Sequence, residues 1–198
     1  MLDVFNHFAF LLNERLNSGA FTSEAAVRHT FFHALLNSPD YFHWEVIFES
    51  PYSKSSGAKI DILVKSSRGK KDLVIEFKYD RRNTKRTNPK PRTMQAASLF
   101  NDVFRLAFFE SKSKAERYLI YLTDAEMIAY FRNPCNNFQD FFDLPENKVY
   151  SIRKDDFLDR LPAFKKKLKV DPIDCKLLSI ISRDLDKNHS LRIYGVIP

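Results

Sequence analysis

Glycine is scarce in this chain of 198 residues, which contains only four glycines. The two that lie nearest to each other in the sequence, Gly57 and Gly69, are twelve positions apart. The dinucleotide-binding fingerprint, the phosphate-binding P-loop and the GxSxG nucleophile elbow each need two glycines within about three to seven positions. The sequence therefore excludes all three motifs and the enzyme classes that depend on them.

Cysteine and long apolar runs are also scarce. Cys135 and Cys175 are forty positions apart, so no CxxC metal or redox motif exists, and both are expected to be reduced thiols of a cytosol-like compartment. No run approaches the roughly 18 apolar residues of a membrane span. The first residues include Asp3 and lack the basic region of a signal peptide. We expect a soluble, cytoplasmic protein without a membrane partner.

Aromatic and charged residues, by contrast, are plentiful. Aromatic residues make up 14% of the chain, including 19 phenylalanines, and charged residues make up 29%. Disordered chains are poor in aromatic residues, so this composition indicates a folded protein. A chain of this length is most often one domain, and we expect a single domain over residues 1–198.

Apolar periodicity predicts an α/β fold with a mixed sheet. Helical spacing indicates a helix over residues 2–17 and a second one from the candidate caps Thr22 and Ser23 to Pro39. Short β-branched or aromatic runs then indicate three strands, and their short connections favour an antiparallel meander. The three strands are expected over residues 44–49, 58–65 and 72–79. The long helix that follows is expected over 93–109, and the next strand over 116–122.

The last third of the chain has a weaker pattern. Asp124 is expected to cap a short helix that ends near Phe131. A small strand over 148–152 and a helix over 157–169 follow. The alternation in residues 176–183 and 190–197 predicts a closing hairpin.

A group of charged residues interrupts the two strands that are expected over 58–65 and 72–79. Glu76 and Lys78 point to one face of their strand, about 7 Å apart along it, while the opposite face is fully apolar and must be covered by a helix. If the two strands form a hairpin in which Val64 pairs with Leu73, Asp61 lies opposite Glu76. The sequence therefore predicts two neighbouring carboxylates beside a lysine.

Two adjacent carboxylates repel each other unless a cation lies between them, and carboxylate oxygens suit Mg²⁺ or Mn²⁺. Lys78 could then stabilise developing negative charge or orient an attacking water. The alternative is an exposed face of the meander, in which Asp61, Glu76 and Lys78 meet water and the last two form an ion pair.

These residues resemble the signature of the PD-(D/E)XK nuclease superfamily, which includes restriction endonucleases, junction resolvases and repair nucleases. Asp61 is followed by fourteen residues and then by Glu76-Phe77-Lys78, and a helix that carries Glu24 precedes them. The expected element order over about 22–123 is similar to the restriction-endonuclease-like core, with 124–198 as a C-terminal extension. Ile60 stands where the motif's name has a proline.

The resemblance implies roles for individual residues. Asp61, Glu76 and the main-chain carbonyl of Phe77 would bind the metal ion, and Lys78 would be the catalytic lysine. Glu24 matches an acidic residue that some members use for catalysis and metal binding, and Gln95 matches a glutamine that opens the next helix in others. From the residues alone, Glu24 could instead be a first-turn residue or pair with Arg28, and Gln95 could be an ordinary helix-start residue.

One basic segment accounts for most of the net charge of +7. Residues 81–92 contain no acidic residue, and without this segment the chain has 26 basic and 25 acidic residues. It follows the strand that holds Glu76 and Lys78, so it could contact phosphates near them, although a solvated loop is the common meaning of such a run. Its six cations are Arg81, Arg82, Lys85, Arg86, Lys90 and Arg92.

His29 and His33 have the spacing of two metal ligands on one helix. Thr30 stands where a zinc protease motif requires glutamate, and no third ligand is evident. A packed or partly exposed pair of histidines is the better interpretation.

The sequence thus predicts a Mg²⁺- or Mn²⁺-dependent endonuclease that hydrolyses DNA, of the restriction or repair type. Cleavage of both strands would favour a symmetric homodimer. The alternative is a non-catalytic nucleic-acid-binding or interaction module that keeps the nuclease fold.

Overall fold

The computed structural model describes residues 1–20, 22–39, 41, 45–51, 59–65, 71–81, 90–109, 114–160, 164 and 168–198. All statements about the structure below concern these residues.

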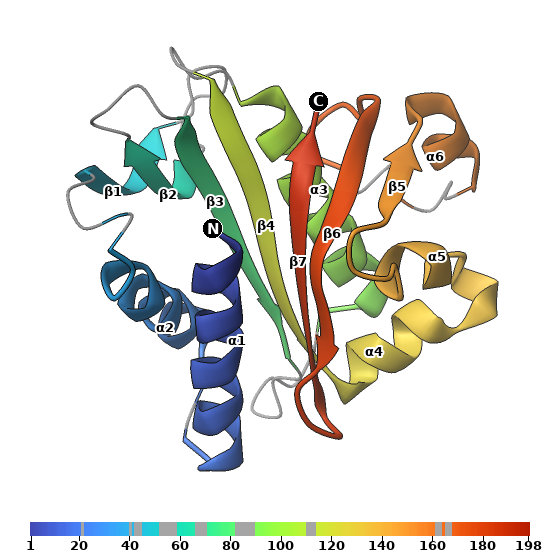
Figure 1. Cartoon of the computed structure of the whole chain (residues 1–198). Coiled ribbons are helices and arrows are strands. Elements are labelled where there is room, and N and C mark those ends of the chain that lie inside the picture. The colour runs from blue at the N-terminus through green and yellow to red at the C-terminus, as the bar shows by residue number, and fades with distance from the viewer. Residues whose placement is uncertain are drawn as a thin grey trace.

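A seven-stranded mixed sheet forms the centre of the molecule (Figure 1). Its strands lie in the order β1-β2-β3-β4-β7-β6-β5. Among the strands of the described residues, only β3 and β4 are parallel neighbours, and the long helix α3 connects them, as a parallel pair requires. The strands span Glu45–Pro51 (β1), Lys59–Lys65 (β2), Asp72–Asp80 (β3), Ala115–Asp124 (β4), Val149–Ile152 (β5), Cys175–Asp184 (β6) and His189–Ile197 (β7).

Helices cover both faces of this sheet (Figure 1). The pair α1 and α2 packs on one face, and the helices that follow pack on the other. The helices span Leu2–Asn17 (α1), Glu24–Leu36 (α2), Arg92–Phe108 (α3), Ala125–Arg132 (α4), Gln139–Phe142 (α5) and Lys154–Arg160 (α6), with a 3₁₀ turn over Pro134–Asn136.

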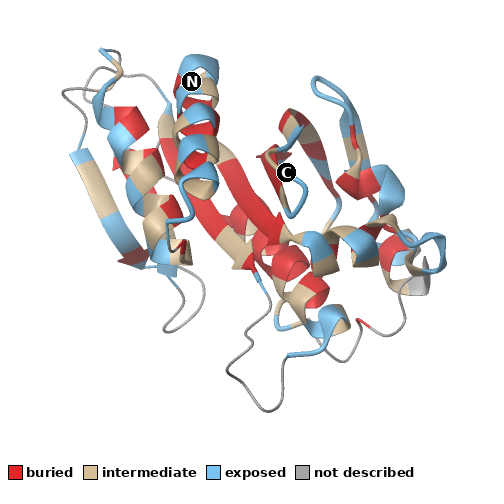
Figure 2. Cartoon of the chain, turned by 90° about the horizontal axis from the view of Figure 1, so that it is seen from below, coloured by how far each residue is buried: buried red, intermediate tan, exposed pale blue. Residues whose placement is uncertain are grey.

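Two hydrophobic clusters follow from this layering. On the α1 and α2 face, the apolar side of β3 packs beneath Phe31, whose ring lies 5.4 Å from that of Phe77. On the other face, Phe100 of α3 meets aromatic rings from the last third of the chain, among them Phe138 at 5.6 Å and Phe157 at 4.8 Å. Figure 2 shows buried residues along the central strands and the inner sides of the helices, between the two exposed outer layers.

The structure confirms the expected α/β class, the mixed sheet and the antiparallel meander of β1, β2 and β3. Val64 pairs with Leu73, as expected. The helical caps are also confirmed, because Ser23 Oγ accepts a hydrogen bond from Ala26 N and Asp124 Oδ1 accepts from the first turn of α4.

The helix predicted over residues 157–169 begins at a different residue in the structure. The helix α6 begins at Lys154, three residues earlier, because the carboxylate of Asp174 accepts the Lys154 N–H at 2.8 Å and satisfies a free donor at the helix end. Asp174 is twenty positions away, so local spacing could not reveal this contact. Residues 161–163 and 165–167 of the predicted helix lie outside the described residues.

The last third of the chain forms part of the central sheet. The predicted hairpin is present as β6 and β7, and β7 pairs antiparallel with β4 along seven residue pairs, from Tyr118–Gly195 to Asp124–His189. The stretch after residue 124 therefore completes the sheet beside the predicted core. Among the helices of the described ranges, none has the length and apolar character that would let it cross a bilayer.

Candidate functional site

Glu76 is the most deeply buried charged residue of the predicted constellation. Its side chain is 3% exposed, on the face of β3 that packs against α3. Arg105 Nη2 of α3 donates a hydrogen bond to Glu76 Oε1 at 2.8 Å. The alternative of an exposed face with a Glu76–Lys78 ion pair is therefore wrong, since Glu76 is buried and its ionic partner is Arg105.

Burial raises the pKa of Glu76 well above its usual range, and the attraction of Arg105 only partly opposes this effect. Repulsion from the carboxylates of Asp61 and Asp102 raises the same pKa further. Asp61 also accepts a hydrogen bond from the main-chain N–H of Phe77, the residue that follows Glu76. The predicted neighbourhood of the two acidic residues is therefore present.

Asp61 lies just beyond the last backbone pair of β2 and β3. The paired residues run from Val64–Leu73 to Ile62–Ile75, and one step further Asp61 Oδ2 accepts a hydrogen bond from Phe77 N at 2.8 Å. The main chain of Phe77 therefore lies against the Asp61 carboxylate. Asp61 Oδ1 is 3.3 Å from Arg28 Nη1 of α2, so both oxygens of this carboxylate have partners.

Glu49 of β1 adds a strained backbone position beside Asp61. The residues directly before and after Glu49 pair with Ile62 and Ile60 of β2, so Glu49 lies opposite Asp61. Its φ of 51° is in the left-handed region, which is uncommon for residues other than glycine. Backbone strain of this kind is concentrated at functional sites, so its position agrees with a functional role for this end of the sheet.

Lys78 points to the same face as Glu76 and reaches α3. Its Nζ donates to Ser98 Oγ at 2.9 Å and lies 3.6 Å from Asp102 Oδ2. The ammonium group is therefore held by a helix hydroxyl and a buried carboxylate. Burial raises the pKa of Asp102 to about 6, against the attraction of Lys78 and Arg105.

Glu24 opens α2 and contacts the end of β3. Its Oε2 accepts a hydrogen bond from Tyr79 N at 3.1 Å, and its Oε1 is 3.4 Å from Arg28 Nη2. Arg28 thus links Glu24 to Asp61. The pair with Arg28, which was the alternative interpretation of Glu24, is present. The contact with Tyr79 also holds Glu24 beside the strand that carries Glu76 and Lys78.

Only part of the basic segment lies within the described residues, because Arg82, Lys85 and Arg86 fall outside them. Desolvation lowers the pKa of Lys90, and repulsion from Lys78 lowers it further, so the end of this segment lies near the candidate site. Arg81 Nη1 instead donates to Thr22 O at 2.8 Å.

The other two described residues of this region face different partners. Arg92 Nη2 lies 3.4 Å from Glu126 Oε2, so Arg92 is directed toward α4. Gln95 Nε2 donates to Lys90 O at 3.2 Å. Gln95 therefore fixes the backbone of Lys90 at the start of α3.

The donor chemistry of the site suits a divalent cation. Asp61 and Glu76 offer neighbouring carboxylate oxygens, the hard ligands that Mg²⁺ and Mn²⁺ prefer. Among the described residues, no three His, Cys, Asp or Glu side chains are grouped closely enough to hold a metal ion alone. A bound ion would therefore complete its shell with main-chain carbonyls, water or substrate, as Mg²⁺ commonly does.

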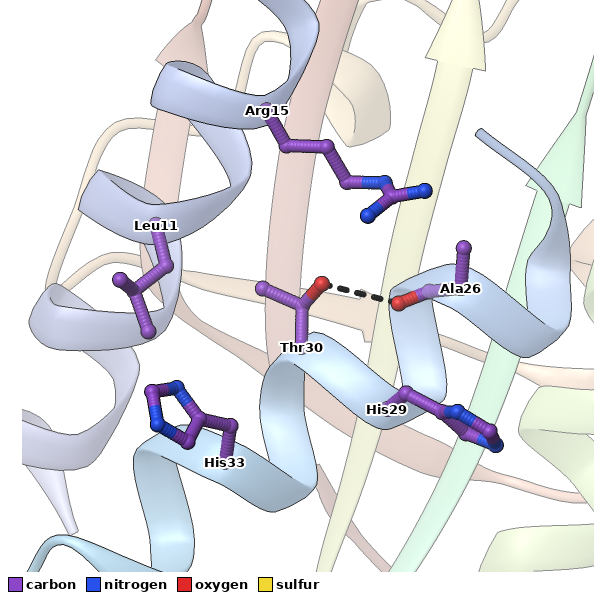
Figure 3. Close-up of a pocket in the computed structure, with 6 residues that line it drawn as sticks. All are labelled: Leu11, Arg15, Ala26, His29, Thr30 and His33. Atoms are coloured by element: carbon purple, nitrogen blue, oxygen red, sulfur yellow. Dashed lines mark hydrogen bonds between the residues drawn. The ribbon is translucent and has the colours of Figure 1, made fainter. Parts of the chain in front are cut away.

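His29 and His33 line a separate groove of about 400 Å³ between α1 and α2 (Figure 3). Both residues are exposed, and their imidazole rings point to different sides of α2 in Figure 3. Thr30 Oγ1 donates to Ala26 O at 2.9 Å and does not link them. Of the packed or partly exposed pair that was expected, the structure shows two exposed histidines.

Sequence reasoning missed the residues of α3 that complete the site. Ser98, Asp102 and Arg105 are spaced by four and three positions, so they form a polar stripe on a helix that is otherwise largely buried. A polar stripe along a buried helix is a signal that could have been found. The sequence indicates Arg28 only as a partner of Glu24, because its bridge to Asp61 depends on how α2 packs against the sheet.

Comparisons of the chain with protein-family models, with curated proteins and with solved structures give no match.

Proposed function

We propose that this chain is a Mg²⁺-dependent nuclease that hydrolyses phosphodiester bonds in DNA, with a core of the PD-(D/E)XK type. The observation that carries the proposal is the buried Glu76, which lies beside Asp61 on a sheet face that also presents Lys78. Such a carboxylate cluster costs stability, because burial and mutual repulsion both oppose its charge, and proteins accept such costs mainly at functional sites. The order α2, β1, β2, β3, α3, β4 supports a core of this type.

Each residue has a role in this proposal. Asp61 and Glu76, with the main-chain carbonyl of Phe77, would hold the ion, and Glu24 would add negative charge from α2. When bound, Mg²⁺ polarises the scissile phosphate and lowers the pKa of a coordinated water.

The basic residues would act on the substrate. Lys78, fixed by Ser98, offsets the charge that develops on the phosphate. The basic segment contacts the DNA backbone, and Lys90 at its described end interacts electrostatically with Lys78 of the site.

Cleavage of a supercoiled plasmid tests this proposal. We expect nicking in Mg²⁺, none in EDTA, and a loss of at least about 100-fold in rate in Glu76→Ala and in Lys78→Ala. Lys71→Ala is the matched control, since Lys71 is an exposed lysine that pairs with Glu116. Cleavage retained by both site variants would refute the assignment.

A second candidate is a non-catalytic nucleic-acid-binding or interaction module with the same fold. The observation that favours it is that arginines already balance both carboxylates, Arg105 at Glu76 and Arg28 at Asp61. This module would bind DNA equally well in EDTA, with an affinity that falls steeply with salt and depends on residues 81–92. Equal affinity with and without Mg²⁺, together with no cleavage, would support this candidate over the nuclease.

A further inference from the structure

The guanidinium of Arg105 occupies the position of a cation in the carboxylate cluster. Its Nη2 lies 2.8 Å from Glu76 Oε1 and 3.0 Å from Asp102 Oδ1, so one nitrogen bridges two carboxylates from different elements. Attraction to both carboxylates raises the pKa of Arg105, although burial opposes the rise. The cluster is therefore neutralised from within the chain.

Arg105 is also the more exposed member of its ion pair with Glu76. The Arg105 side chain is 27% exposed, whereas that of Glu76 is 3% exposed. The guanidinium is therefore the part of this ion pair that solvent reaches more easily. Because like charges repel strongly where water is largely excluded, a divalent ion and Arg105 compete for the same carboxylate oxygen.

We propose that Arg105 is a displaceable countercharge, which holds Glu76 in the metal-free protein and moves to a substrate phosphate when a divalent ion takes its place. This inference rests on the proposed function, because it assumes that Asp61 and Glu76 bind the ion. A guanidinium suits the exchange, since its fork of donors binds carboxylates and phosphates with similar geometry. Arg105 thus couples metal binding to DNA binding.

Calorimetric titration of the metal-free full chain with Mn²⁺ tests the competition. Arg105→Gln removes the charge, and we expect the Mn²⁺ dissociation constant to fall by about tenfold or more. Arg105→Lys keeps the charge and is expected to bind Mn²⁺ much as the unmodified chain does. Arg132→Ala is the control for a change of net charge, since Arg132 pairs with Asp143 and Asp184 instead.

The outcomes separate this inference from the proposed function. If the unmodified chain binds no Mn²⁺ but Arg105→Gln does, Arg105 is a fixed countercharge that the ion does not displace, and both the exchange and the proposed metal-dependent function fail. If both bind Mn²⁺ with equal affinity, the inference is wrong and the proposed function stands. If neither folded protein binds Mn²⁺, both are wrong, and circular dichroism of each variant establishes that it is folded.

DNA affinity provides a second measurement, by fluorescence anisotropy with a short labelled duplex. In EDTA, Arg105 stays on Glu76, so Arg105→Gln should leave the DNA affinity unchanged. In Ca²⁺, which can occupy the site with little hydrolysis, the variant should bind DNA about tenfold more weakly. An equal loss in both buffers, or no loss in either, would overturn the proposed movement.

Discussion

The buried carboxyl group of Asp102 should make the stability of the metal-free protein depend on pH. Its pKa is about 6 in the folded chain, against 3.8 as its ordinary value, so between these values the folded state keeps a proton that the unfolded state releases. The free energy of unfolding should therefore fall as the pH rises from about 4 to about 6, by at most about 3 kcal/mol from this group. The raised pKa of Glu76 acts in the same direction.

Urea unfolding at pH 4.5, 5.5 and 6.5 in EDTA measures this effect. In Asp102→Asn the neutral side chain cannot titrate, so the decrease should be smaller than in the unmodified chain. Carboxylates with a lowered pKa, such as Asp184, change the free energy of unfolding only at lower pH, so they contribute little between pH 4.5 and 6.5. A free energy that rises with pH to the same extent in both proteins would contradict the burial of Asp102.

At the scale of residues, the sequence could predict the charged side chains of two neighbouring strands but not their ionic partners. Asp61, Glu76 and Lys78 follow from alternation along neighbouring strands and from one hairpin register, which are local properties. Arg105 reaches Glu76 only because α3 crosses the sheet at a particular height and rotation. Helix periodicity fixes which residues of α3 share a face, but the packing of α3 on the sheet decides which strand residue they meet.

Among the elements, α2 depends on its N-cap for the position of Glu24. Ser23 Oγ accepts a hydrogen bond from Ala26 N at 3.1 Å. Ser23 directly precedes Glu24, whose carboxylate accepts a hydrogen bond from Tyr79 N. Ser23→Ala should lower the free energy of unfolding by about 1 kcal/mol, because a donor at the helix start loses its partner. For a chain of this size, the melting temperature should fall by roughly 2–4 °C.

Differential scanning calorimetry measures that change, and Ser23→Asp is the control because aspartate also caps helices well. The aspartate variant should melt close to the unmodified chain. Equal losses in the two variants would show that steric fit at position 23, and not the cap, sets the stability.

Element boundaries were predictable where a local residue ends the element. Asp124 ends β4 and caps α4 within three residues, and the structure confirms this boundary. The start of α6 was not predictable, because Asp174 supplies the cap from a distant loop. The start of a helix is therefore predictable when the residue that caps it is near in sequence, as at α4, and not when it is distant, as at α6.

For the whole molecule, the fold class was predictable and the completed sheet was not. Alternation along 176–183 and 190–197 predicted the hairpin, but it could not show that β7 lies beside β4. The pairing buries Ile193 and Leu191 against the α1 and α2 face, so it depends on surfaces that form only on folding. The nearly continuous apolar run of β4 predicted only that this strand is buried on both faces.

The central claim is that Asp61 and Glu76 together bind a divalent ion, and the melting temperature with and without Mn²⁺ tests it most directly. Mn²⁺ at about 100 times its dissociation constant should stabilise the folded chain by about 2.7 kcal/mol, which corresponds to a rise of roughly 5–10 °C. Asp61→Asn should abolish the rise while the protein remains folded in EDTA. No rise in the unmodified chain, or the same rise in Asp61→Asn, would contradict the claim.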